Sequence, residues 1–293
     1  MNNLFCFGLG FSALTLARRL MDEGWIVAGT CRSAEKCEAM KGRGIEAHMF
    51  DGTAPLDPAG EAALRAADHL LISIPPNQDG DPALNKTGTI LRDMAGQFRW
   101  VGYLSTTGVY GDTRGATVTE DSPLAPTSNR SRQRAEAEAA WLELHERARL
   151  PVHIFRLAGI YGPGRSVLDQ LKRGNARCVD KPGHKFSRIH VEDIANVLRA
   201  SIGQPAPSAI YNVCDDEPAP QADVVAHGAK LLGLPAPTPV PFEQAAETMS
   251  PMARSFWRDN RTVSNARLKR DLNLRLAYPT YREGLAAILA DGE

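Results

Sequence analysis

The sequence has no excess of charge of either sign and few cysteines. Its 293 residues include 34 Lys and Arg against 34 Asp and Glu, so the formal net charge is zero. Without a basic field, we expect neither a nucleic-acid-binding protein nor a membrane-surface protein. The five cysteines contain no Cys-x-x-Cys pair, and the seven histidines contain no His-x-x-x-His pair. This composition predicts no metal site and fits a reducing compartment.

Long hydrophobic runs are also missing. No apolar run approaches the roughly 18 residues that cross a bilayer. The first residues lack a basic leader, and their apolar stretch contains glycines and runs into Arg18 and Arg19, unlike a signal peptide. We therefore expect a cytoplasmic protein. The hydrophobic share of 43% is typical of a globular chain, and the length suggests one large domain or two smaller ones.

Short apolar runs alternate with helix-like runs over residues 4–160. The apolar runs are nearly continuous, as in strands that are buried on both faces of a parallel sheet. This order predicts an α/β fold, a Rossmann-type doubly wound parallel sheet. Strands are expected at 4–7, 25–30, 46–50, 69–74, 100–105 and 152–157, and helices at 12–23, 33–41, 61–67, 83–97 and 130–149.

The last third of the chain has a different composition. Ten of the 20 prolines follow residue 200, mostly in close groups. Proline ends helices and strands, so these groups predict short elements joined by loops. We expect a small, loop-rich C-terminal domain that ends in a helix at 281–290.

A glycine motif follows the first expected strand. It is a Gly-x-Gly-x-x-Ala run that contains Gly8, Gly10, Phe11, Ser12 and Ala13. The first glycine permits a tight turn, the second lets a pyrophosphate approach the backbone, and the alanine keeps helix and strand close. The helix N-terminus then supplies N–H groups to the phosphates. The motif predicts a dinucleotide site, and a plain strand-to-helix turn is the alternative.

The end of the second expected strand carries no acidic residue for a ribose 2′-hydroxyl. Arg32 and Ser33 stand there instead, and a guanidinium group suits a 2′-phosphate. NADP is therefore the expected cofactor, with NAD as the less favoured one; a solvated Arg32 is the alternative. Asp51, after the third strand, is placed to meet the adenine amino group, or simply forms a turn.

Five blocks of sequence carry a family resemblance. They are Gly8–Ala13, Leu104–Gly111, Arg156–Gly164, Arg188–Ala195 and Tyr211–Val213. In this order they resemble an extended short-chain dehydrogenase/reductase, the group that includes NAD-dependent epimerases and dehydratases.

The resemblance implies a nucleotide domain of residues 1–162 and 186–214 and a small substrate-binding domain of residues 163–185 and 215–293. Ligands bind beyond the carboxyl ends of strands in such sheets. We therefore add Ile74, Pro75 and Ser105 to the expected cofactor-binding residues.

The resemblance also implies a catalytic Ser or Thr and a Tyr-x-x-x-Lys pair. Thr106 matches the first position, but Arg130 and Arg134 stand where Tyr and Lys are expected. Arginine stays protonated, so Arg130 cannot act as a general acid or base. Arg134 remains a candidate for holding the ribose hydroxyls. Alternatively Arg130, Arg132 and Arg134 bind an anionic group, or these arginines form a solvated surface with Glu136 and Glu138.

Two functions follow from these residues. The first is an NAD(P)-dependent oxidoreductase, or an epimerase- or dehydratase-like enzyme of the atypical branch, that acts on a small anionic or sugar-like molecule. Tyr110 and Tyr161 are further phenols in the matching blocks. Each is a candidate proton donor, although phenols at such positions are more often packing residues. The second function is a non-catalytic NADP(H)-binding sensor, favoured by the loss of the Tyr and Lys. We expect a monomer or a homodimer.

Overall fold

The computed structural model describes residues 2–292, which form two compact units. The first unit runs from the N-terminal strand to Thr106 and adds Asn129–Arg156 and Ile194–Tyr211; the second contains Thr107–Ser128, Leu157–Asp193 and the chain from Asn212 onward. The two units are similar in size, whereas the sequence suggested a small second domain. The nucleotide- and substrate-binding roles assigned to the two domains remain predictions.

The division differs from the predicted one at four segments, residues 107–128, 157–162, 186–193 and 212–214, which belong to the second unit. Residues 107–128 contain the 3₁₀ helix η1 (Thr107–Tyr110) and strand β6 (Thr117–Val118), and β6 pairs with β13 (Thr262–Val263) far along the chain. Strand β8 (Gly159–Tyr161) pairs with β10 (Arg188–His190) in the same way. The β6–β13 pairing joins residues 107–128 to the second unit, and the β8–β10 pairing keeps residues 157–162 and 186–193 together, although their sequences continue the nucleotide-domain blocks.

A seven-stranded parallel sheet forms the first unit, in the order β11-β7-β5-β4-β1-β2-β3. The chain winds outward from β1 to β3 on one side and then crosses to β4 on the other side of β1. This reversal confirms the expected doubly wound fold and places the switch point between β1 and β4. The strands are β1 Asn3–Phe7, β2 Ile26–Cys31, β3 Glu46–Met49, β4 His69–Ile72, β5 Trp100–Thr106, β7 Val152–Leu157 and β11 Ile210–Val213.

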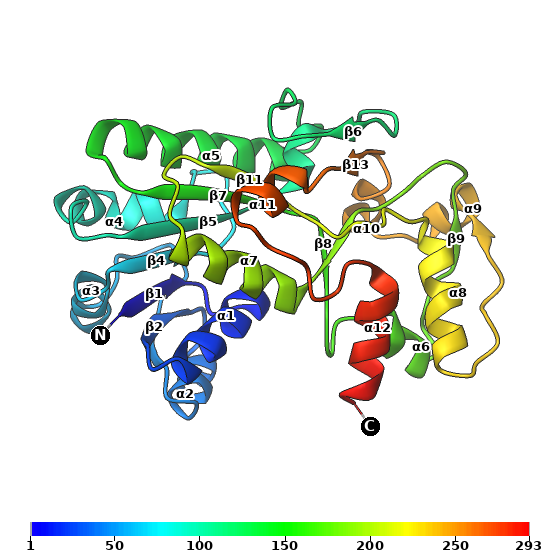
Figure 1. Cartoon of the computed structure of the whole chain (residues 1–293), viewed down its shortest axis with the longest axis horizontal. Helices are drawn as coiled ribbons and strands as arrows, with labels where there is room; N and C mark the ends of the chain where they lie inside the picture. Colours follow the sequence, from blue (N-terminus) through cyan, green and yellow to red (C-terminus); the bar gives the residue numbers. More distant parts are fainter. Residues whose placement is uncertain (1, 293) are drawn as a thin grey trace. The chain divides into compact units, whose positions relative to one another are not determined.

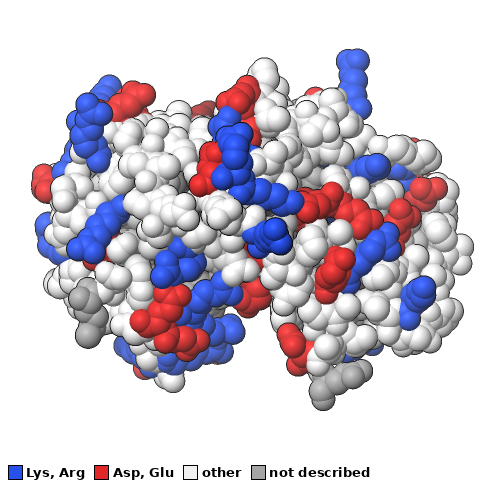
Figure 2. Space-filling model, in the orientation of Figure 1, with Lys and Arg blue, Asp and Glu red and all other residues white. Residues whose placement is uncertain are grey.

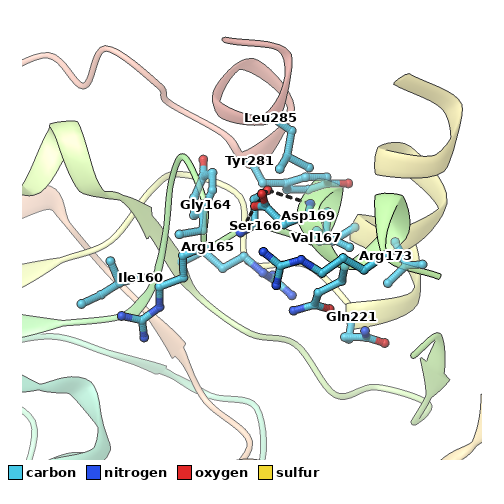
Figure 3. Close-up of a pocket in the computed structure, with 15 residues that line it drawn as sticks. Ile160, Gly164, Arg165, Ser166, Val167, Asp169, Arg173, Gln221, Tyr281 and Leu285 are labelled. Atoms are coloured by element: carbon cyan, nitrogen blue, oxygen red, sulfur yellow. Dashed lines mark hydrogen bonds between the residues drawn. The ribbon is translucent and has the colours of Figure 1, made fainter. Parts of the chain in front are cut away.

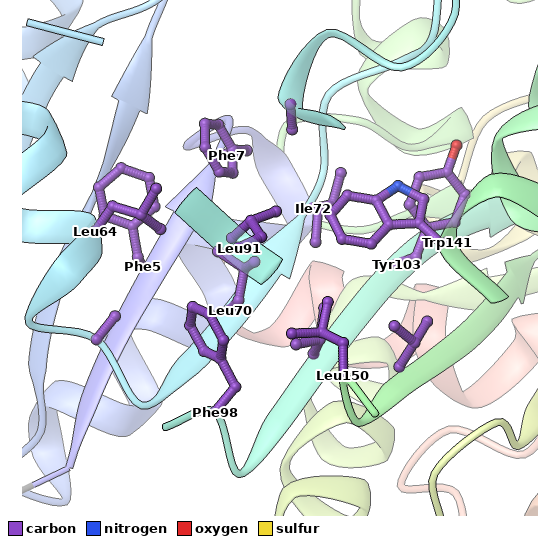
Figure 4. Packing of buried hydrophobic residues seen from close by; sticks show 14 of the residues in the cluster. Phe5, Phe7, Leu64, Leu70, Ile72, Leu91, Phe98, Tyr103, Trp141 and Leu150 are labelled. Atoms are coloured by element: carbon purple, nitrogen blue, oxygen red, sulfur yellow. The ribbon is translucent and has the colours of Figure 1, made fainter. Parts of the chain in front are cut away.

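Helices cover both faces of this sheet (Figure 1). On one face, side chains of α3, α4 and α5 pack on alternate residues of the strands, around Phe7, Ile72 and Trp141 (Figure 4). On the other face, Trp100 Nε1 donates a hydrogen bond of 3.0 Å to Ser201 Oγ in α7. The helices are α1 Phe11–Asp22, α2 Ala34–Lys41, α3 Pro58–Arg65, α4 Pro82–Asp93, α5 Asn129–Ala148 and α7 Val191–Gly203.

The second unit consists of short elements, as its prolines predicted. One of its hydrophobic clusters joins Tyr161 and Tyr281 with leucines of the neighbouring helices. The expected final helix has its predicted bounds, α12 (Tyr281–Ala290). The remaining elements are α6 Val167–Lys172, α8 Gln221–Leu231, α9 Phe242–Glu247, α10 Pro251–Ser255, α11 Ala266–Asp271, β9 Val179–Asp180 and β12 Val240–Pro241.

The surface carries charges of both signs close together. On the face in Figure 2, Lys and Arg lie next to Asp and Glu, in keeping with the zero net charge. Among residues 2–292, no helix is both long and apolar enough to cross a membrane. The same residues contain no group of three or more His, Cys, Asp or Glu placed to hold a metal ion.

Candidate functional site

The turn after β1 is tightly fitted. Gly8 has a φ of +91°, and a Cβ there would lie 2.6 Å from Ile74 Cγ2. Its N–H donates a 2.8 Å hydrogen bond to Thr30 Oγ1 of β2. Only glycine suits this position, because both the backbone conformation and the neighbouring side chain exclude any other residue. The fold itself therefore explains Gly8, and it places Ile74 against the loop, while a contact between Ile74 and the cofactor stays a prediction.

Gly10 differs from Gly8. It is the N-cap of α1, its φ is −94°, and a Cβ at this position would meet no atom within 4 Å. The fold therefore tolerates a side chain at Gly10, but a side chain would occupy the open space above the helix N-terminus. No side chain caps α1, and the first turn of a helix leaves N–H groups such as those of Ser12 and Ala13 without intrahelical partners. This arrangement suits a phosphate group.

The rest of the loop fits a dinucleotide as well. Ala13 is fully buried, as a residue that keeps α1 close to the sheet must be. Phe11, the first residue of α1, is half-buried. Ile74 and Pro75 follow the carboxyl end of β4, beside the switch point. The residues present therefore fit a pyrophosphate-bearing cofactor.

Arg32 and Ser33 lie at the carboxyl end of β2. The Arg32 side chain is exposed and has no hydrogen-bond or ion-pair partner within the described chain. Ser33 is the N-cap of α2, and its Oγ accepts a 3.3 Å hydrogen bond from Lys36 N. The guanidinium group is thus available to an anion, whereas the serine hydroxyl already has one structural task.

Asp51 forms a turn. Its Oδ1 accepts hydrogen bonds from the N and Oγ1 of Thr53, at 2.8 and 2.7 Å. These bonds lower the pKa of the Asp51 carboxyl. The geometry matches the turn-forming alternative, and a contact between Asp51 and an adenine stays a prediction.

The first turns of α5 place the two substituted positions differently. Arg134 Nη1 donates hydrogen bonds to Leu104 O at 2.8 Å and to Tyr103 Oη at 3.1 Å. These bonds hold its guanidinium group at the end of β5, the strand whose last residue is Thr106. Arg130 lies one turn earlier and is exposed. The structure therefore brings Arg134 to the strand that carries Thr106.

Comparisons with known proteins agree with this geometry. Residues 89–214 match the family model described as NAD dependent epimerase/dehydratase family. The chain is 32% identical over 245 residues to Protein YeeZ of Escherichia coli (strain K12), covering 81% of this chain and 86% of that protein. The chain belongs to the NAD-dependent epimerase/dehydratase family. The resemblance stated from the sequence is confirmed.

Two solved structures extend the comparison. A functionally unknown conserved protein from Silicibacter pomeroyi DSS is 48% identical over the full length of both chains, with a TM-score of 0.89. A dTDP-glucose 4,6-dehydratase from Bacillus anthracis str. Ames, in complex with NAD, is 16% identical, covers 99% of this chain and 96% of its own, and has a TM-score of 0.77. This second likeness shows the shared fold alone.

The interpretation of α5 as a solvated surface is wrong for Glu138. This carboxylate is buried and pairs with Arg156 of β7, with Nη2 and Oε2 2.8 Å apart. The Ser105 hydroxyl also donates to it. Ser105, an expected cofactor-binding residue, is therefore buried and already bonded within the protein. For Arg132 the surface interpretation holds, because it is exposed and bonds Asn129 in its own helix.

The two further phenols are packing residues. Tyr110 is 1% exposed, and its Oη donates a 2.7 Å hydrogen bond to Asn212 Oδ1. Tyr161 Oη lies 3.4 Å from Thr280 O, and burial raises the pKa of this phenol above its usual range. A phenol with a raised pKa gives up its proton less readily. Neither the bonded Tyr110 nor the buried Tyr161 therefore replaces the family tyrosine.

Sequence reasoning missed Asp81. Its Oδ1 accepts hydrogen bonds from Ala83 N and Leu84 N, and its Oδ2 accepts one from Trp141 Nε1. Burial raises the pKa of this carboxyl. The Asp-Pro pair that begins α4 was the available signal, since aspartate is a preferred N-cap and proline a preferred first residue. Asp81 thereby fixes the end of the loop that follows β4.

Proposed function

We propose that this protein is an NADP-dependent oxidoreductase, or an epimerase or dehydratase, that acts on a small anionic or sugar-like molecule. One observation carries the proposal: Gly10 keeps the N-terminus of α1 uncovered, although the fold tolerates a side chain there. A bare, uncapped helix N-terminus beside the switch point is the arrangement that binds a pyrophosphate. Several structural neighbours are described as complexes with NAD, which agrees with a dinucleotide at this loop.

NADP is preferred to NAD because of Arg32. The side chain is exposed at the end of β2 and has no partner in residues 2–292, so its guanidinium group can pair with a 2′-phosphate. We expect Arg32→Ala to weaken NADPH binding at least about tenfold, the loss of one charge-assisted hydrogen bond, and to leave NADH binding nearly unchanged. Titration of NADPH fluorescence measures both affinities.

A matched control for this variant is Arg43→Ala, which removes another exposed arginine from the loop after α2. Its NADPH affinity should equal that of the wild type. Equal affinities for NADPH and NADH in the wild type, unchanged in Arg32→Ala, would refute the NADP assignment.

The bound nicotinamide would supply hydride transfer, and this chain would position the reactants. We assign the substrate oxygen to the Thr106 hydroxyl at the end of β5. Arg134 lies near the same strand end, and its N–H groups beyond Nη1 are assigned to the ribose hydroxyls. Neither Arg130 nor Arg134 can exchange a proton, because guanidinium groups do not deprotonate in proteins. The proton of the reaction must therefore come from the substrate, water or another side chain.

A non-catalytic NADP(H) sensor is the second candidate, and the replacement of the family's Tyr and Lys by Arg130 and Arg134 favours it. The hydrogen bonds of Arg134 to β5 stabilise the contact between α5 and β5 whether or not the site turns over substrate. A screen of aldehydes, ketones and nucleotide sugars, followed by NADPH absorbance, separates the two functions. Turnover that Thr106→Val abolishes supports the enzyme; tight NADPH binding without turnover supports the sensor.

A further inference from the structure

The second unit contains a pocket of about 420 Å³, within the roughly 300–1,000 Å³ range of small-molecule sites. It lies among α6, α8, α12 and the segment after β8 (Figure 3). Aliphatic and aromatic side chains form much of the wall, among them Val224, Tyr281 and Leu285. Every lining residue belongs to the second unit. The pocket is therefore complete without the glycine loop.

The charged residues of the pocket are unbalanced. Three arginines (Arg165, Arg173 and Arg188) line it, against one carboxylate, that of Asp169. The Asp169 carboxylate is already engaged, because Oδ2 accepts hydrogen bonds from the N and Oγ of Ser166 at 2.8 and 2.6 Å. The formal charge of the lining is thus three minus one, or +2.

The hydrogen bonds of Arg188 involve only one nitrogen of its guanidinium group. Its Nη1 donates to Phe186 O at 2.8 Å and to Ala219 O at 3.0 Å. Nε and Nη2 have no hydrogen-bond partner in the described chain. Neither atom is fully enclosed by protein, so both face accessible space. No carboxylate of residues 2–292 forms an ion pair with this guanidinium group. A largely buried positive charge without a counter-ion is costly, and an anionic ligand would remove that cost.

Asp215 interacts electrostatically with Arg188 but does not remove this cost. Burial raises the pKa of Asp215 to about 7, so this carboxyl is only partly ionised near neutral pH. Neither carboxylate oxygen of Asp215 has a hydrogen-bond partner in the described chain. At the pocket rim, Arg173 follows α6 and is exposed, and its side chain has no partner in the part of the chain that the structure describes. In Figure 3, the Arg173 side chain extends toward the other lining residues that are drawn.

We propose that this pocket binds a phosphate monoester with an apolar or aromatic body. A phosphate monoester carries a charge of about −1.5 to −2 at neutral pH, which matches the lining, and guanidinium groups bind its oxygens in pairs. The apolar wall packs against the organic body. The ligand would bind independently of the dinucleotide loop, as a second site on the protein.

Isothermal titration calorimetry of the full-length protein with 1-naphthyl phosphate tests the proposal. We expect saturable binding, and inorganic phosphate should bind at least about tenfold more weakly because it lacks the body that packs on the wall. Arg173→Gln should weaken binding about threefold, as for an exposed charge. Arg188→Gln should weaken it about tenfold or more, as for a buried charged hydrogen bond.

Two variants serve as matched controls. Lys172→Gln removes a neighbouring exposed charge of α6 that does not line the pocket, and Arg32→Ala probes the dinucleotide loop. Both should bind 1-naphthyl phosphate as the wild type does. Since Arg188 is largely buried, its variant is used only if its urea unfolding midpoint is near that of the wild type. If the midpoint is lower, Arg173→Gln alone carries the test.

Three results would overturn the proposal. The first is no binding of 1-naphthyl phosphate at about 1 mM, where a weak but specific site is still measurable. The second is equal affinity for inorganic phosphate, which would show that the wall contributes nothing. The third is loss of binding in Arg32→Ala with no change in Arg173→Gln, which would place the ligand at the glycine loop.

Discussion

The buried carboxylate of Glu138 on α5 pairs with the guanidinium group of Arg156 on β7. Its side chain is 2% exposed and that of Arg156 is 4% exposed, and the pair also holds Ser105. Removing one member of a buried pair leaves the other charge uncompensated, which typically costs about 3–5 kcal/mol. We therefore expect Glu138→Gln to lower the free energy of unfolding by that amount. Urea unfolding followed by tryptophan fluorescence measures the loss.

A control lies on the same helix. Glu143 pairs with Arg147 at 2.5 Å, but the two side chains are 51% and 77% exposed, so Glu143→Gln should cost no more than about 0.5 kcal/mol. The double variant Glu138→Leu/Arg156→Met should recover much of the loss, because no buried charge is left. A loss below about 1 kcal/mol for Glu138→Gln would refute the reasoning, since the pair would then behave as a surface pair.

Three further outcomes are expected. Gly8→Ala should destabilise the protein by about 1–3 kcal/mol in urea unfolding, because of its left-handed backbone. Gly10→Ala should leave stability nearly unchanged but reduce NADPH affinity in a fluorescence titration; unchanged affinity would remove the pyrophosphate from this loop. Tyr110→Phe should cost about 1–3 kcal/mol by depriving Asn212 of its donor, without changing any turnover; lost turnover in a folded variant would restore Tyr110 as a proton donor. Asp215 has a folded-state pKa raised from 3.8 to about 7, so the free energy of unfolding should fall as pH rises from about 4 to 7 and then stay constant. Asp215→Asn should reduce this fall, as measured by urea unfolding across that pH range. Parallel pH profiles of the variant and the wild type would contradict the expectation.

Features with a local signal were predictable from the sequence. The glycine loop, the buried strands and α12 follow from residue patterns within a few positions of each other. The bounds of α12 agree because Thr280 and Glu283 form a capping box at its start. Helix α3 was expected to begin at residue 61 but begins at Pro58, where Asp57 caps it by accepting from Gly60 N. That cap was a local signal too, and it was overlooked.

Features that depend on distant contacts were not predictable. Glu138 and Arg156 lie on α5 and β7, and only the packed structure shows that they meet. The direction of Arg134 toward the carbonyl of Leu104 is likewise set by the packing of α5 on β5. The pocket of the second unit needs three helices that are scattered between residues 167 and 290. Single-sequence patterns carry no information on such distances, so these sites are evident only in the folded structure.

The bonds of Arg134 to β5 also bear on kinetics. In relatives with a tyrosine and a lysine at these positions, protonation of the pair can appear in a pH–rate profile. A guanidinium group fixed by Leu104 O and Tyr103 Oη keeps one charge over the whole working range of pH. Any ionisation that limits turnover of this protein between pH 5 and 9 must therefore be assigned to a group outside the α5 positions 130 and 134, and the search for the proton donor can start from the measured midpoint.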